Sequence, residues 1–234
     1  MAEFQDAFVQ AARLLGRADP ELLEIIALSL RVSLTALVLA CGVGLPAGAA
    51  LGVLRFPGRR ALVVLLNALM GLPPVVLGLA LYLVLSRSGP LGFLGLLFTP
   101  TAMVLAQWLL VTPIVAALTR QVVEDLHEEW EEEFRSLGAG RLRSLLELLY
   151  EGRFQLATAV LAGFGRAIAE VGAVLIVGGN IAHVTRVMTT AIAMETNKGE
   201  LSLALALGIV LLGLSLLVNA GLVAAQELGR VARG

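Results

Sequence analysis

This chain of 234 residues contains very little lysine, cysteine or histidine, and each shortage excludes a class of chemistry. Lys198 is the only lysine and follows no G-x-x-x-x-G pattern, so the chain has no P-loop with which to hydrolyse ATP. Cys41 is the only cysteine, which excludes an internal disulfide. The two histidines are far apart in sequence and predict no metal site. Nucleophile-elbow and HExxH motifs are also missing, so no motif indicates an enzyme.

Charged residues are scarce as well, at 15% of the chain, whereas soluble domains contain about 25%. Hydrophobic residues make up 58% and the mean hydropathy is +0.90, which is more apolar surface than one soluble core can bury. These residues come in long runs rather than in alternating segments of about ten residues, which predicts an all-α polytopic membrane protein and not an outer-membrane barrel. The net charge of -1 argues against a nucleic-acid partner.

Five apolar segments are long enough to cross a hydrocarbon core, which needs about 20 helical residues. They lie at about 24–54, 61–85, 100–120, 156–178 and 201–225. In the first segment, Gly42, Gly44 and Gly48 allow close contact with another helix. In the second, Pro73 and Pro74 remove two backbone donors, so the helix must bend or break there.

The charges outside these segments predict the orientation of the chain. Residues 3–18 form an amphipathic helix, which lies either in the membrane interface or against a neighbouring subunit. The first residues are acidic, so no cleavable signal peptide is expected. Arginines concentrate at 55–60, at 120–153 and at the C-terminal end. Because basic loops stay in the cytoplasm, we expect the N-terminus outside and the 121–153 segment and the C-terminus in the cytoplasm.

The polar 121–153 segment is predicted to form a helix, a glycine break and a second helix with one apolar face. The apolar residues of the second helix are Leu142, Leu145, Leu146 and Leu149. Such a face requires a cover, either from its own bundle or from a partner. Before the break, Glu132-Glu133-Phe134 is followed after three residues by Gly138. This spacing resembles the E-A-A-x-x-x-G motif of permease subunits of binding-protein-dependent ABC importers, although the alanines and the motif's later proline are replaced.

Further stretches extend this resemblance over about residues 25–230. GLPAG at 44–48 resembles the first core span of the family, and LPPVVLGLAL at 72–81 and GFGRAIAEVGAVLIVGGNI at 163–181 resemble its molybdate, sulfate and tungstate branch. YEGRF at 150–154 with TRVMTTAIAMETNKGE at 185–200 is most similar to tungstate-type permeases. A molybdate, sulfate or other ABC importer permease is the alternative within the family. A secondary transporter is the alternative outside it, although the chain has no internal repeat.

The resemblance implies a type I ABC importer permease fold in one transmembrane domain, residues 1–234, in a prokaryotic inner membrane. Two copies would form the translocation pathway, and two separate ATPase subunits would use ATP and Mg on the cytoplasmic face. No cofactor is expected in this chain. A binding protein outside would deliver an oxyanion. The residues expected to couple the permease to the ATPase are Glu132, Glu133, Phe134, Leu137, Gly138, Ala139 and Arg141.

Polar residues in and after the fourth segment are candidates for the pathway. Arg166 and Glu170 are four residues apart at depth in the membrane, where they form either a structural ion pair or part of the pathway. The pathway and gate candidates are Pro73, Pro74, Arg166, Glu170 and Asn180. The outer segment 180–200 carries donors that suit an anion, or that dock a binding protein without touching substrate. These are His183, Thr185, Arg186, Thr189, Thr190 and Lys198.

Overall fold

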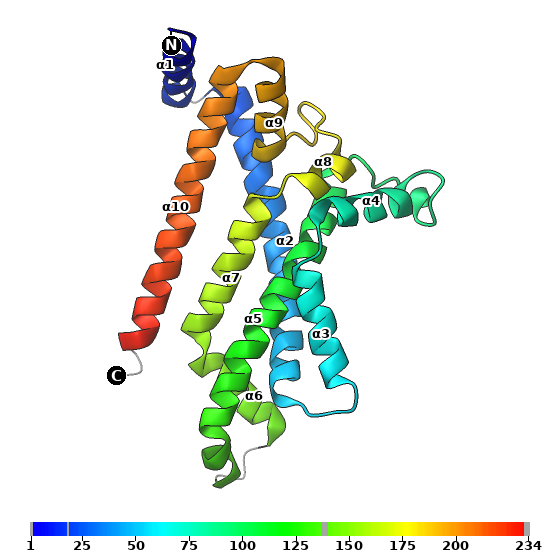
Figure 1. Ribbon diagram of the computed structural model, residues 1–234, viewed down its shortest axis with the longest axis vertical. Helices are drawn as coiled ribbons and strands as arrows, with labels where there is room; N and C mark the ends of the chain where they lie inside the picture. Colours follow the sequence, from blue (N-terminus) through cyan, green and yellow to red (C-terminus); the bar gives the residue numbers. More distant parts are fainter. Residues whose placement is uncertain (1, 18, 137–139, 232–234) are drawn as a thin grey trace. The chain divides into compact units, whose positions relative to one another are not determined.

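The fold is helical over the residues that the structure describes. The computed structural model describes residues 2–17, 19–136 and 140–231, and none of these residues lies in a strand. In chain order the helices are α1 (Ala2–Gly16), α2 (Pro20–Val53), α3 (Arg59–Met70), α4 (Pro74–Leu85), the short 3-10 helix η1 (Gly92–Leu94), α5 (Pro100–Ser136), α6 (Arg141–Glu151), α7 (Arg153–Ile168), α8 (Gly172–Gly178), α9 (Met188–Lys198) and α10 (Leu201–Val231) (Figure 1). The predicted all-α class is confirmed.

Within the described part of the chain, three helices are long and apolar enough to cross a membrane, namely α2, α5 as far as Trp130 and α10 as far as Gly221. The pairs α3–α4 and α7–α8 are each bent at a short break, and they give up to five candidate spans if each pair counts as one. These elements occupy the five apolar segments of the sequence. α2 alone has 34 residues, or about 51 Å of helix, which exceeds the hydrocarbon thickness of about 30 Å.

The second apolar segment is broken at its two prolines. α3 ends at Met70, and α4 begins with Pro74 after an extended Pro73 (φ -62°, ψ 125°). A proline at the first helical position costs no intrahelical hydrogen bond, because the N–H there has no partner in any helix. The prediction that the helix bends or breaks at this point is confirmed.

The chain divides into two compact units, and α2, α5, α7 and α10 contribute to both. The first unit comprises the residues up to Ala36, Pro73–Gln107 and Ala167–Leu217. The second comprises Leu37–Leu72, Trp108–Arg166 and the residues from Val218 onward.

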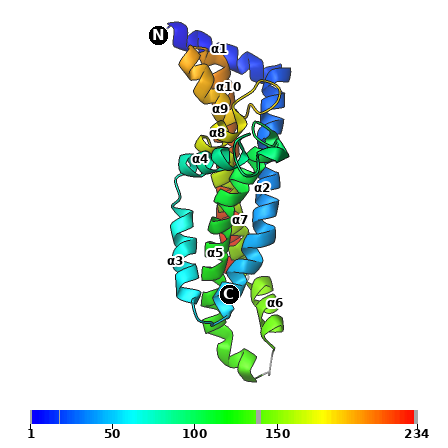
Figure 2. The same ribbon diagram turned by 90° about the vertical axis from the view of Figure 1, so that its right-hand side faces the viewer.

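In the first unit, two local arrangements set the positions of the helices. Asp19 caps α2, because its Oδ1 accepts the backbone N–H groups of Glu21 (3.0 Å) and Leu22 (3.3 Å), and the chain turns a corner between α1 and α2 (Figure 2). α4 packs closely on α8 at Gly78, where a Cβ would come within 2.8 Å of Ala173 Cα. The broken half-helices thus meet through a residue without a side chain.

In the second unit, α2 and α5 approach each other along a line of glycines. A Cβ on Gly44 would lie 3.0 Å from Val115, and one on Gly52 would lie 2.9 Å from Val123. A Cβ on Gly48 would overlap the carbonyl oxygen of Ala116. Spacing of small residues by four is the pattern that brings membrane helices into backbone contact. The predicted close contact is confirmed at Gly44 and Gly48.

Candidate functional site

The predicted coupling segment comprises the end of α5 and the start of α6. Glu132 and Glu133 are exposed, whereas Phe134 is half-buried and packs on a cluster of buried apolar residues. That cluster consists of Ala49, Val123, Leu126 and Leu148, from α2, α5 and α6. Leu137, Gly138 and Ala139 lie outside the described residues, and Arg141 is the first residue of α6. Among the side chains of this set that the structure describes, the two exposed carboxylates can meet another protein.

α6 finds most of its cover within the same unit. Leu148 is 1% exposed, and Leu145 and Leu149 pack partly buried against the same cluster. Leu146 and Tyr150, one turn apart, remain exposed at 60% and 65%. The guanidinium of Arg153 lies 4.4 Å from the centre of the Tyr150 ring and donates to the Tyr150 carbonyl (2.8 Å). The bundle thus covers one face of α6 and leaves an exposed edge with a fixed tyrosine.

A three-residue charge cluster joins α3 to α5, and sequence reasoning missed it. Glu124 accepts hydrogen bonds from Arg59 (2.6 Å) and from Arg120 one turn before it, while Arg59 Nε donates to the carbonyl of Leu51 at 2.8 Å. The Arg120–Glu124 spacing of four was visible in the sequence. The Arg59 contact spans 65 positions, so only the fold could reveal it. The cluster fastens the turn after α2 to α5.

The pathway candidate Glu170 lies at the start of the half-helix α8. Its side chain is 3% exposed, and Oε1 accepts the Ala173 N–H at 3.1 Å. A carboxylate in this position satisfies an unpaired donor and complements the positive end of the helix. The hydroxyl of Thr189 donates to the Glu170 carbonyl (2.7 Å). Arg166 and Glu170 both take part in further interactions, and their mutual pairing stays a prediction.

Replacing Glu170 by alanine is expected to lower the free energy of unfolding by about 1 kcal/mol, because the Ala173 N–H loses its acceptor in a buried place. Glu170→Gln keeps an amide oxygen at the same distance and is the matched control. The measurement is the thermal unfolding midpoint of the purified protein in detergent. An equal loss in both variants would contradict capping as the main role of this side chain.

Asn180 and the threonines near it form an internal hydrogen-bond network. Thr190 donates to Asn180 Oδ1 at 2.9 Å, and Thr185 donates to the Gly178 carbonyl at 2.6 Å and accepts the Ile181 N–H at 2.9 Å. Thr185 and Thr190 are each 1% exposed and Thr189 is 7% exposed. These hydroxyls hold the 179–190 segment in shape. A contact between any of these threonines and an anion stays a prediction.

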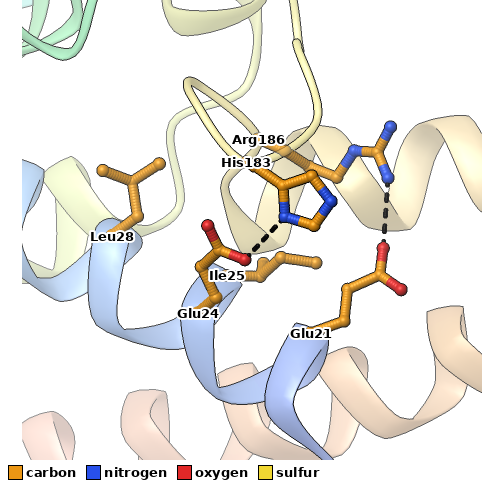
Figure 3. A pocket seen from close by; sticks show the side chains of 6 residues that line it. All are labelled: Glu21, Glu24, Ile25, Leu28, His183 and Arg186. Atoms are coloured by element: carbon orange, nitrogen blue, oxygen red, sulfur yellow. Dashed lines mark hydrogen bonds and ion pairs between the residues drawn. The ribbon is translucent and has the colours of Figure 1, made fainter.

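The basic candidates of this segment are paired with carboxylates, and the side chains of His183 and Lys198 are exposed whereas that of Arg186 is only 16% exposed. His183 Nδ1 lies 2.8 Å from Glu24 Oε2, and Arg186 Nη1 donates to Glu21 Oε1 at 3.3 Å (Figure 3). Lys198 pairs with Glu195, three residues before it in α9, at 3.1 Å. Both acidic residues of the first two pairs come from the start of α2, and the sequence did not suggest them. The structure thus brings His183 and Arg186 together and keeps Lys198 with its own helix.

Over the residues that the structure describes, no cluster of acidic, histidine or cysteine side chains could hold a metal ion. The arrangement is that of a helical membrane component with broken half-helices, an acidic end of α5 and paired charges beside α2. Residues 44–225 match the model of the binding-protein-dependent transport system inner membrane component, and the chain belongs to this family. It is a permease component of an ABC transporter, not an enzyme, and members work with an ATPase and a binding protein.

Among its relatives, the chain is 43% identical to the tungstate uptake system permease protein TupB of Peptoclostridium acidaminophilum, over 97% of this chain and 100% of that protein. It is 40% identical to TupB of Campylobacter jejuni, over 92% of this chain and 90% of that protein. The sulfate transport system permease protein CysT of Salmonella typhimurium is 33% identical over 70% of this chain and 62% of that protein. The chain is thus more similar to the two tungstate permeases than to the sulfate permease, and the similarity covers a larger share of the chain.

Proposed function

We propose that this chain is the membrane-spanning permease of an ATP-driven, binding-protein-dependent importer of tungstate or a closely related oxyanion. The observation that carries the proposal is full-length similarity at 43% to a tungstate uptake permease, against 33% over a shorter region for a sulfate permease. Two copies form the translocation pathway. Two ATPase subunits bind ATP and Mg on the cytoplasmic face, and an outer binding protein delivers the anion.

The test is uptake into proteoliposomes that contain the permease, its ATPase and its binding protein. We expect ATP-dependent accumulation of tungstate, competed by molybdate more strongly than by sulfate. Uptake that needs no ATP would favour a secondary transporter, and preferred uptake of sulfate would move the chain to the alternative branch. Both results would overturn the proposal.

The orientation follows from the arginine distribution, with the N-terminus outside and the coupling segment inside. Because Cys41 is the only cysteine, a Cys41→Ser background allows single cysteines to be placed for labelling. A cysteine at Ser88 is expected to react with an impermeant maleimide in intact cells, and one at Glu132 only after the membrane is opened. The reverse pattern would contradict the orientation.

Coupling is expected to depend on Gly138, which ends the E-x-x-x-x-x-G spacing. A bulky residue there, as in Gly138→Trp, should leave the permease inserted but separate ATP hydrolysis from uptake, because a compact end of the coupling helix is needed to seat in the ATPase. We expect at least a tenfold drop in tungstate transported per ATP hydrolysed in proteoliposomes. Gly140→Trp, beyond the motif glycine, is the matched control. Normal coupling in Gly138→Trp would exclude this role.

A further inference from the structure

Four polar side chains beside the start of α2 are arranged as two parallel pairs. Glu21 and Glu24 are three residues apart on α2, and His183 and Arg186 are three residues apart on the facing segment, so that Glu24 meets the His183 imidazole and Glu21 meets the Arg186 guanidinium (Figure 3). Glu21 and Glu24 are 48% and 46% exposed. Exposed pairs of this kind contribute little to stability, because water and salt screen them. The Glu24–His183 pair, exposed on both sides, can therefore open at small cost, whereas the Arg186 side chain is only 16% exposed and presents its donors from a mostly buried position.

The segment that carries His183 and Arg186 is nonetheless rigidly placed. His183 has a left-handed backbone (φ 60°), which a non-glycine residue adopts only when its surroundings hold it there. The buried hydroxyl of Ser29 on α2 accepts the Met188 N–H at 2.8 Å. The Thr185 hydroxyl donates to the Gly178 carbonyl and accepts the Ile181 N–H. Opening the pairs thus requires side-chain rotation and no movement of the backbone.

Two hollows adjoin these pairs and share one wall. The first is narrow, has a volume of about 10 Å³ and is lined by all four paired residues. The second is open, has a volume of about 460 Å³ and is lined by Glu24, His183 and also Arg31. The first has room for about one water molecule and none for a tetrahedral oxyanion. Glu24 and His183 line both hollows, so their hydrogen bond lies where the two hollows meet, with Arg186 lining the first and Arg31 lining the second.

Arg186 has a donor that the closed arrangement leaves unused. Its Nε–H is buried and has no acceptor, although Nη1 donates to Glu21. A buried donor without an acceptor is unfavourable, and a guanidinium prefers two parallel bonds to one oxyanion. Glu21 supplies one of these bonds at 3.3 Å. A ligand with several oxygens would satisfy both donors.

We propose that this is a latent site for a tetrahedral, doubly charged oxyanion, formed by Arg31, His183 and Arg186, and that Glu21 and Glu24 are its resident counter-ions. The inference rests on the proposed function. In the paired arrangement the carboxylates occupy the donors of His183 and Arg186; an arriving oxyanion displaces the carboxylates, and their return helps to expel it. A site that competes with its own carboxylates binds weakly, which suits a transporter that must release what it binds.

The test is tungstate binding to the full permease–ATPase complex in nanodiscs of neutral lipid, by equilibrium dialysis with metal analysis. The double variant Glu21→Gln, Glu24→Gln is expected to bind tungstate at least tenfold more tightly than the unchanged protein. Adding Arg31→Gln and Arg186→Gln to it should remove that gain. Glu200→Gln, an exposed carboxylate just after α9, is the matched control and should change nothing.

Unchanged binding in the double variant would overturn the inference, as would a gain that survives loss of both arginines. If the double variant gains affinity for anionic lipid in the nanodisc but none for free tungstate, the site binds lipid phosphate. That result also overturns the inference. ATP-dependent uptake by the unchanged complex is measured in parallel. If uptake occurs without the binding change, only this site fails; if no uptake occurs, the proposed function fails.

Discussion

Replacing Gly48 by leucine is expected to destabilise the permease by about 3 kcal/mol. A Cβ at this position would overlap the Ala116 carbonyl and lie 2.8 Å from Thr119 Cβ. A backbone carbonyl in the middle of a helix cannot rotate away, so α2 and α5 would have to separate. Overpacking of a closed interior costs roughly 1–3 kcal/mol, and the backbone contact places this variant at the upper end.

For a chain of this length, a loss of about 3 kcal/mol lowers the unfolding midpoint by roughly 6–12 °C. The measurement is thermal unfolding in detergent, with the monodisperse yield as a second reading. Gly42→Leu is the matched control, because it lies on the same helix, is exposed and has nothing within 4 Å of its Cβ position. Equal destabilisation by the two variants would show that helix flexibility, not close packing, is what Gly48 provides.

These glycines show which part of the fold the sequence could predict. Spacing by four in an apolar helix indicates a close contact whatever the partner, so Gly44 and Gly48 could be identified without the structure. The sequence could not name α5 as the partner or separate Gly42, which faces outward, from the other two. The same holds for Pro73 and Pro74, which predict a break but not the packing of α4 on α8.

The candidate site was harder to predict, because polar residues in a loop look alike in a sequence. Thr185, Thr189 and Thr190 were grouped with His183 and Arg186 as donors for an anion. The structure separates them, since the threonines are buried in internal hydrogen bonds, whereas the exposed His183 and the half-buried Arg186 are paired with carboxylates of α2. Burial depends on contacts between distant segments, which no local pattern contains. The carboxylates of α2 were missed for the same reason.

The coupling segment shows a similar limit. From the sequence, either a partner or the bundle itself could cover the apolar face of α6. The structure favours the bundle for most of it, because Leu148 and Phe134 pack with residues of α2 and α5. The end of α5 is therefore built into the second unit through an apolar cluster on one side and Glu124 on the other. A force applied to this segment would reach α2 and α3 through these contacts.

Replacing Glu124 by alanine is the second change expected to have a large effect. Arg59 and Arg120 would then keep their charges in partly buried places, with side chains 24% and 13% exposed and no carboxylate between them. Removing one partner of a buried pair costs 3–5 kcal/mol, and the remaining exposure reduces this to about 2 kcal/mol. We expect the unfolding midpoint to fall by roughly 4–8 °C.

The loss should be local as well as global, because Glu124 fastens the turn between α2 and α3. That turn contains Arg55, and Arg59 and Arg60 begin α3 directly after it; all three are trypsin sites. Limited proteolysis is therefore expected to cut residues 55–60 several times faster in Glu124→Ala, since local opening becomes easier when a tertiary anchor is removed. Glu128→Ala is the matched control, because Glu128 is exposed and lies one turn further along α5. This variant should be cut at the rate of the unchanged protein. If both variants were cut alike, the anchor would have to be assigned to Arg59 and the Leu51 carbonyl alone, and movement of α5 would reach the α2–α3 turn only through the apolar cluster.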